Sequence, residues 1–142
     1  AVTSTALADN DTRMIYISET GRRVMQYDLA NDRQLPDLAD FSKDPAVPMV
    51  LVMNPTPDGQ LLISTGKGFI LVDARSGKVL RDYPLQGMGW AAVNSSADGQ
   101  YALIGNFFTG DIVKVRLADG AVVAKNNIGQ KESLSGVAQF PG

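Results

Sequence analysis

Residues 58–63 read Asp-Gly-Gln-Leu-Leu-Ile, and related runs stand at residues 98–103 (Asp-Gly-Gln-Tyr-Ala-Leu) and 11–16 (Asp-Thr-Arg-Met-Ile-Tyr). A second landmark follows each of these runs in the same order, and its copies are residues 24–29, 69–74 and 112–117. The spacing is nearly constant, since Asp28, Asp73 and Arg116 are 45 and 43 residues apart. Self-similarity at a fixed period of this length is typical of repeat architectures. The chain is therefore predicted to contain three copies of one unit.

Each unit carries signals for short strands joined by tight turns. Gly in the Asp-Gly pairs provides the positive φ that hairpin turns need. Residues 112–117 alternate between apolar and polar side chains, as a strand with two different faces does. No stretch of eleven or more residues shows helical periodicity with caps, so we expect almost no helix. The predicted strands are residues 2–7, 14–18, 24–29, 49–53, 61–65, 69–73, 90–94, 101–105, 112–117 and 121–125.

Four short strands in a unit of about 40–50 residues are typical of a β-propeller blade. The predicted fold class is all-β, a partial propeller of three blades plus the first strand of a fourth. We expect the blades at residues 1–45, 46–86 and 87–130, and the orphan strand at residues 134–142. Propellers close with about four to eight blades, so the missing neighbours come either from a longer propeller or from further copies in a homo-oligomer.

Composition excludes several classes of function. The 142 residues include 13 Lys and Arg against 15 Asp and Glu. The chain therefore has no excess of basic residues, and we predict no nucleic-acid partner. There is no Cys and no His, which excludes disulfide scaffolds, thiolate or imidazole metal sites, and Ser–His or Cys–His nucleophile pairs. The apolar runs are far shorter than the roughly 18 residues of a membrane-spanning helix, so we expect no membrane span.

The first residues bear on localisation. The chain begins Ala-Val-Thr without an initiator Met. A signal peptide cleaved after a small residue leaves such a start, and so does a cloning boundary. We therefore expect a secreted or periplasmic protein.

Loop side chains provide the candidate binding residues. In a propeller, the loops after the second strand and the loops between blades emerge on one face. The chain places these candidates there: Arg22, Arg23, Lys67, Met88, Trp90, Asn106, Phe107 and Phe108. The hairpin that turns at residues 98–99 brings residues 88–90 close to residues 106–108, and rigid aromatic side chains dominate binding hot spots. A Phe pair also fits packing in the seam between blades, so both roles stay open.

Two short motifs match the residue patterns of known binding sites but not the structural context that those sites need. Residues 87–92 satisfy Gly-x-Gly-x-x-Ala, but a dinucleotide site needs these glycines before a helix, and here they precede a strand. Residues 9–11 begin like a calcium loop, but Arg13 occupies the next ligand position. We predict no catalytic residue from the sequence.

The units resemble the blades of YVTN-type β-propellers and, more loosely, those of quinoprotein-like and gluconolactonase-like propellers. The shared pattern is an Asp-Gly turn, a Val-x-Val-x-Asp strand and an x-Gly turn. The signature tetrad corresponds to residues 16–19 (Tyr-Ile-Ser-Glu) and 103–106 (Leu-Ile-Gly-Asn). The resemblance implies blade geometry and leaves the chemistry open, because one fold serves many functions.

Two functions remain open at this point. The absence of His favours a non-catalytic scaffold or binding module, with a protein or small-molecule ligand and no cofactor. The alternative is a fragment or subunit of a propeller enzyme, either a lactonase-like hydrolase or a quinoprotein-type dehydrogenase. Resemblance to the lactonase-like group implies a Ca²⁺ ion at the channel mouth, for which Glu19 and Asn106 are weak candidate ligands.

Overall fold

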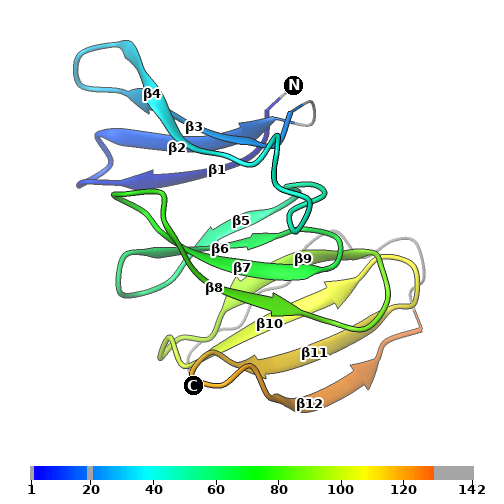
Figure 1. Ribbon diagram of the computed structural model, residues 1–142. Coiled ribbons are helices and arrows are strands. Elements are labelled where there is room, and N and C mark those ends of the chain that lie inside the picture. The colour runs from blue at the N-terminus through cyan, green and yellow to red at the C-terminus, as the bar shows by residue number, and fades with distance from the viewer. Residues whose placement is uncertain (1, 19–20, 130–142) are drawn as a thin grey trace.

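A computed structural model describes residues 2–18 and 21–129, which form twelve β-strands in three four-stranded antiparallel sheets and no helix (Figure 1). Each sheet contains four strands consecutive in the chain, paired in chain order. Sheet 1 is β1 (Val2–Ala8), β2 (Arg13–Ser18), β3 (Arg23–Asp28) and β4 (Arg33–Asp40); sheet 2 is β5 (Met53–Pro55), β6 (Gln60–Ser64), β7 (Gly68–Asp73) and β8 (Val79–Pro84); sheet 3 is β9 (Trp90–Ser95), β10 (Tyr101–Asn106), β11 (Asp111–Arg116) and β12 (Val122–Asn127). The all-β prediction is confirmed.

The predicted strand at residues 49–53 is wrong in its position, because the first strand of sheet 2 begins only at Met53. Ser64 explains the difference. The Leu51 N–H donates to the Ser64 carbonyl at 3.0 Å, while the Ser64 hydroxyl accepts the Val52 N–H at 3.0 Å. Leu51 and Val52 thus both bind the single residue Ser64, and the Ser64 hydroxyl takes the place of a backbone carbonyl in the ladder. This interrupts regular strand pairing before Met53.

The outer strands β4 and β8 are the fourth strands expected in each unit, but the predicted strand bounds do not include them. Most side chains of both are exposed, so they show little apolar alternation in the sequence. They exist because β3 and β7 offer them an unpaired edge, with Tyr27 opposite Gln34 and Phe69 opposite Tyr83. Tertiary pairing here outweighs weak local propensity.

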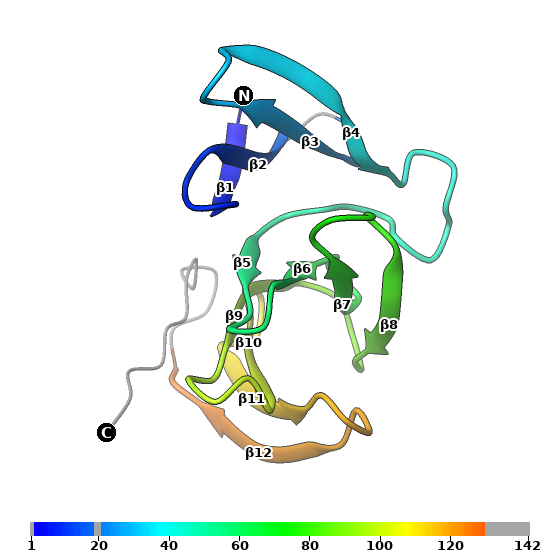
Figure 2. The same ribbon diagram turned by 90° about the vertical axis from the view of Figure 1, so that its left-hand side faces the viewer.

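The three sheets stack one after another, with sheet 2 between its neighbours (Figures 1 and 2). In each sheet, we call the side toward the next sheet in the chain the leading face, and the side toward the preceding sheet the trailing face. Successive residues of β6 alternate between the two, since Leu61 and Ile63 join the core with sheet 1, whereas Leu62 joins the core with sheet 3. Sheet 2 is therefore buried on both faces.

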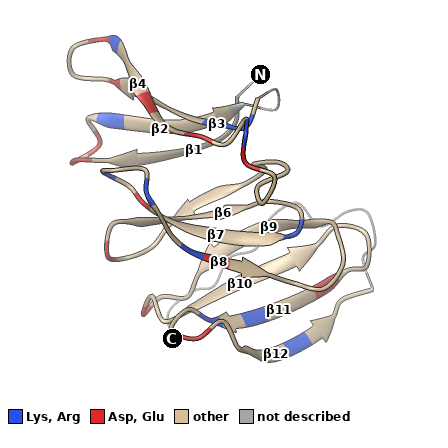
Figure 3. Cartoon of the chain, in the orientation of Figure 1, with Lys and Arg blue, Asp and Glu red and all other residues tan. Residues whose placement is uncertain are grey.

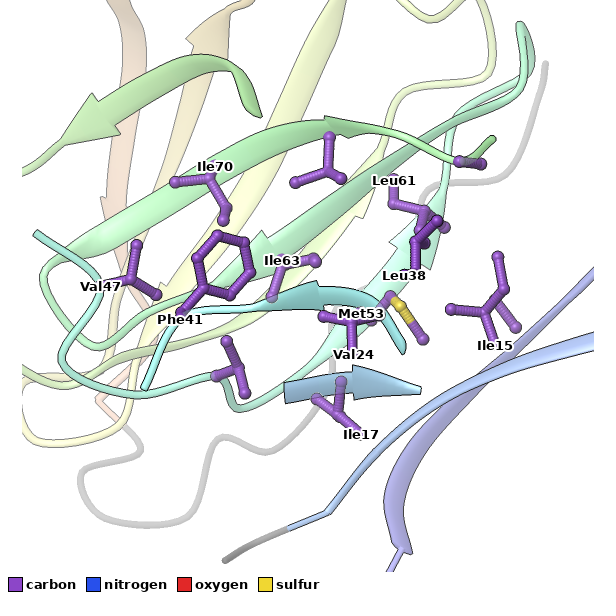
Figure 4. Packing of buried hydrophobic residues seen from close by; sticks show 14 residues of the cluster. Ile15, Ile17, Val24, Leu38, Phe41, Val47, Met53, Leu61, Ile63 and Ile70 are labelled. Carbon is purple, nitrogen blue, oxygen red and sulfur yellow. The ribbon is translucent and has the colours of Figure 1, made fainter. Parts of the chain in front are cut away.

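The core between sheets 1 and 2 also includes the chain that connects them. Ile15, Ile17 and Val24 come from sheet 1 and are fully buried. Phe41, in the connecting segment, lies among Ile63, Ile70 and Val47, and this segment thereby closes the side of the core (Figure 4).

The core between sheets 2 and 3 is richer in aromatic side chains. Phe69 and Tyr83 stack with their ring centroids 4.5 Å apart, and Trp90 belongs to the same cluster. Opposite the Phe69–Tyr83 pair, sheet 3 contributes Trp90 of β9 together with small and branched residues: Val93, Ala102, Ile104, Val113 and Val115. Aromatic rings from both sheets thus share this core.

Side chains of one sheet also donate hydrogen bonds to carbonyls of the next. Arg13 donates to Ala74 O at 2.9 Å, and Tyr83 donates through its hydroxyl to Leu117 O at 2.6 Å. Both carbonyls stand just after the third strand of their sheet, where no ladder partner is available. In Figure 3, other charged residues lie on turns, on outer strands and on third strands such as β11, and β6 carries none.

The structure corrects the superposition of the third unit. Gln60 pairs with Asp73, whereas Tyr101, not Gln100, pairs with the corresponding Arg116. The hairpin turn of sheet 3 is one residue longer, because its closing bond runs from Ser96 N to Tyr101 O, and the bond in sheet 2 runs from Thr56 N to Gln60 O. The extra residue keeps Ala102 and Ile104 facing sheet 2, so burial decides the register. The predicted orphan strand at residues 134–142 lies outside the described residues.

Replacing Gly77 by Ala tests the contact between sheets 1 and 2. A Cβ at Gly77 would lie 1.8 Å from the Leu38 carbonyl oxygen of β4, whereas one at Gly59 would meet nothing within 4 Å. Both glycines have positive φ, +72° and +82°, so either substitution costs about 1–2 kcal/mol of backbone strain. Gly77→Ala should cost a further 1–3 kcal/mol, roughly, from overpacking. Chemical denaturation measures both free energies, and equal losses would contradict the packing.

Acid should destabilise the protein through its turn carboxylates. Backbone N–H groups of Arg75 and Ser76 lower the pKa of Asp73, and hydrogen bonds likewise lower the pKa of Asp28 and Asp98. A lowered folded pKa contributes stability above the unfolded value of about 3.9 and loses it as pH falls through the folded value. The melting temperature should hold between about pH 7 and 5 and drop below about pH 4. A fall already between pH 7 and 5 would refute this, and Asp73→Asn should reduce the acid effect.

Candidate functional site

Three loops are joined by backbone hydrogen bonds at one corner of sheets 2 and 3. Trp90 N donates to Gly66 O at 3.0 Å, and Gly66 N donates back to Trp90 O at 3.1 Å. Phe107 N donates to Gly89 O at 2.8 Å. These bonds hold the loops around residues 66, 89 and 107 against each other, and the predicted proximity of residues 88–90 to residues 106–108 is confirmed.

Asn106 holds this corner together from inside. Its side chain is 2% exposed, and its Nδ2 donates to Met88 O at 2.8 Å. Its Oδ1 accepts the N–H groups of Phe108 at 2.9 Å and Thr109 at 3.1 Å. Both ends of the amide are thus engaged in shaping the turn. Asn106 therefore positions the exposed residues of the corner.

Phe107 and Phe108 project from the turn that Asn106 shapes. They are 37% and 55% exposed, and their rings meet edge to face with centroids 5.6 Å apart. The ring of Phe108 covers Gly89, where a Cβ would lie 2.3 Å from Phe108 Cδ2. Neither Phe belongs to the two core clusters of the described residues. The pair is held in place without filling the seam between sheets.

Trp90 lies beneath the corner and is not an exposed aromatic side chain. It is 5% exposed, packs in the core between sheets 2 and 3, and donates through Nε1 to Gln86 O at 3.1 Å. It also lines a cavity of about 460 Å³ between the loop after β8 and the strands β11 and β12. Met88, 49% exposed, lines the same cavity. Trp90 therefore contributes to a concave surface and not to a protruding one.

The cavity has one charged pair in a wall that combines apolar and polar residues. Lys125 Nζ lies 3.8 Å from Asp111 Oδ2, and Leu85, Val113 and Val122 supply apolar surface. Hydrogen bonds from Asn127 and Thr109, together with the Lys125 charge, lower the pKa of Asp111. The cavity thus presents the Asp111 carboxylate beside Lys125. Sequence reasoning missed both residues, because they stand on strands and only the antiparallel pairing of β11 with β12 brings them together.

The remaining predicted binding residues lie apart from this pair or act in the scaffold. The Arg22 guanidinium donates to the carbonyls of Ser42, Asp44 and Val47, and so fixes the connection between sheets 1 and 2. Arg23 pairs with Asp37 at 3.3 Å. Lys67 is exposed beside Gly66, and its loop joins the corner through the backbone. Both Arg22 and Arg23 are therefore engaged in contacts within the protein.

Residues 2–18 and 21–129 contain neither a metal-binding cluster nor a membrane-spanning helix. No group of three or more His, Cys, Asp or Glu side chains in this part of the chain converges as metal ligands. Glu19, the other weak calcium candidate, lies outside it. None of the described elements is a helix long and apolar enough to cross a membrane.

Comparison with known proteins supports the fold alone. No protein-family model and no curated protein matches the chain. Among solved structures, the chain is similar to the computationally designed Ika8 protein, with a TM-score of 0.72 and 16% sequence identity. The match covers 100% of this chain and 41% of that one, so the chain spans less than half the length of its structural relative. The likeness shows a shared arrangement of β-sheets and says nothing of activity.

Substitution of Asn106 by Ala should loosen the corner. It removes the three hydrogen bonds of an amide in a residue that is only 2% exposed, which costs about 1–3 kcal/mol. Asn127→Ala is the control, because the Asn127 amide also makes three hydrogen bonds, two as donor and one as acceptor, but is exposed. Its cost should stay below about 1 kcal/mol. Urea denaturation followed by circular dichroism measures both, and a cost for Asn106→Ala no larger than the control would contradict the assigned role.

Proposed function

We propose that the three sheets are consecutive blades of a β-propeller of the YVTN type, and that the chain is a non-catalytic binding module. The packing of each leading face onto the next trailing face supports the first part, because a propeller repeats this contact from blade to blade. The similarity to a chain of more than twice this length agrees with a propeller that has further blades. In this proposal, the loop corner at Gly66, Gly89 and Phe107 belongs to the binding face.

The observation that carries the binding function is the exposure of an aromatic pair on a rigid frame. The exposed rings of Phe107 and Phe108 are in contact with water, which is unfavourable. A ligand that covers them gains about 25 cal/mol of binding free energy for each Å² of apolar surface buried. The Asn106 bonds and the Phe108–Gly89 contact already order the turn, so little conformational entropy is lost on binding. Aromatic side chains held in this way dominate binding hot spots.

The adjacent cavity extends the same surface. Its volume of about 460 Å³ lies within the range of about 300–1,000 Å³ found for small-molecule sites. Apolar walls with a few polar groups are also typical of such sites, and Asp111 and Lys125 supply these groups here. Met88 lines the cavity, and its carbonyl accepts a hydrogen bond from the Asn106 amide that shapes the turn of the Phe pair. We therefore propose a ligand with an aromatic or aliphatic surface, presented by a small molecule or by a side chain of a partner protein.

Trp90 is the only tryptophan of the chain and lines the cavity, so its fluorescence reports on this site directly. Titration with 1-anilinonaphthalene-8-sulfonate under native conditions should quench or shift this emission with a saturable binding curve. The double variant Phe107→Ser/Phe108→Ser should weaken binding about tenfold, that is by about 1.4 kcal/mol, while changing stability by less than about 1 kcal/mol.

Leu80→Ser provides the matched control, because Leu80 is an exposed apolar residue of β8 outside the corner. It should leave probe binding unchanged. Unaltered binding in the double variant would overturn the binding role of the Phe pair. A loss of stability of several kcal/mol, which is typical of Phe truncation in a core, would assign the pair to packing.

A further inference from the structure

The trailing face of sheet 1 is an apolar surface that no described residue covers. Sheet 1 stands at one end of the stack, so its trailing face has no neighbouring sheet (Figure 1). Strand pairing places four large side chains on this face, all half-buried: Met14, Tyr16, Met25 and Tyr27. Pairing also identifies their counterparts in sheet 2, which sheet 1 buries almost completely: Leu61, Ile63, Ile70 and Val72. The same positions are thus apolar in both sheets and covered in only one.

The polar groups of this face are already satisfied within sheet 1. The Tyr16 hydroxyl donates to Gln34 Oε1 at 2.7 Å, and the Tyr27 hydroxyl donates to Asp32 Oδ1 at 2.5 Å. Burial of the rings would therefore leave neither hydroxyl without a partner, and the usual penalty for burying a polar group is avoided.

The opposite end of the stack provides the complementary surface. Leu103, Ile112 and Lys114 lie on the leading face of sheet 3, and they correspond by strand pairing to Leu62, Phe69 and Leu71 of sheet 2. The three sheet 2 residues pack onto sheet 3, whereas their counterparts in sheet 3 are half-buried. Lys114 lies with its Nζ 4.4 Å from the Tyr101 ring centroid.

Charge matches across these two faces when one is placed on the other in the manner of the existing interfaces. Lys114 takes the place of Leu71, which belongs to the same core cluster as Val113 and Val115 of sheet 3. The counterparts of Val113 and Val115 in sheet 1 are Met25 and Tyr27. Lys114 would then approach Tyr27, whose hydroxyl is bonded to the Asp32 carboxylate. An ammonium at this position is tolerated only beside an acidic partner, and Asp32 supplies one.

We propose that the trailing face of sheet 1 in one copy of the chain receives the leading face of sheet 3 in a second copy, head to tail. The contact repeats the interface already present twice within the chain, and it joins two different surfaces, so the association is heterologous. It does not depend on a ligand at the Phe pair, and either proposal can fail alone.

Sedimentation equilibrium over a concentration series tests the proposal. The wild-type chain should show a mass of two or more copies, while Met25→Lys on sheet 1 and Ile112→Lys on sheet 3 should each reduce it to one copy. Leu80→Lys is the control, because it adds the same charge on β8 away from both faces, and it should associate as wild type. Circular dichroism verifies that each variant remains folded.

Mixing the two variants identifies the geometry. Equimolar Met25→Lys and Ile112→Lys chains retain one intact face each, so the mixture should form two-copy complexes although neither variant does so alone. Lys114→Glu, which leaves the apolar contacts in place, should weaken association roughly tenfold by facing Asp32 with a like charge. A single-copy wild-type mass at the highest soluble concentration overturns the proposal, and so does a loss of association in only one of the two variants.

Discussion

The two-sided burial of sheet 2 is the constraint on which the rest of the structure depends. Neighbouring residues of β6 point in opposite directions, Leu61 toward sheet 1 and Leu62 toward sheet 3, and both are almost fully buried. Each such side chain contributes about 1.5–3 kcal/mol when it is removed from water. A shift of register by one residue would exchange the two sets and disrupt both interfaces together. Sheets 1 and 3 are positioned through this central sheet.

The loop corner follows from the same packing. Because β9 and β10 are fixed against sheet 2 through Trp90 and Ile104, the turn after β10 emerges beside Gly89 at a defined place. Asn106 then converts a chain reversal into a rigid turn that holds Phe107 and Phe108 in solvent. Core packing thus positions the corner, and side-chain hydrogen bonding shapes it. The exposed rings are the part of this arrangement that contributes least to the fold.

Sequence reasoning identified the repeat, the β-strands with strong alternation, and the meeting of Phe107 with Gly89, because these depend on local pattern and on one hairpin. It expected a fourth strand in each unit but gave no bounds for β4 and β8, whose mostly exposed residues carry a weak periodic signal. It did not foresee that Trp90 packs in the core between sheets 2 and 3, or that Asn106 makes three hydrogen bonds, although both residues line the cavity. The Asp111–Lys125 pair depends on the register of β11 and β12, which sequence alone does not fix.

Native-state hydrogen exchange of backbone amides tests most directly whether sheet 2 is the central element. Local opening releases weakly packed strands first, whereas strands packed on both faces exchange only on global unfolding. Amides of β6 and β7, such as those of Leu62 and Ile70, should therefore show the highest protection, equal to the global free energy of unfolding. Amides of β4 and β12 should exchange through local openings whose free energy is lower than that of global unfolding. Protection that is highest in β3 or β11 and lower in β6 and β7 would contradict the account.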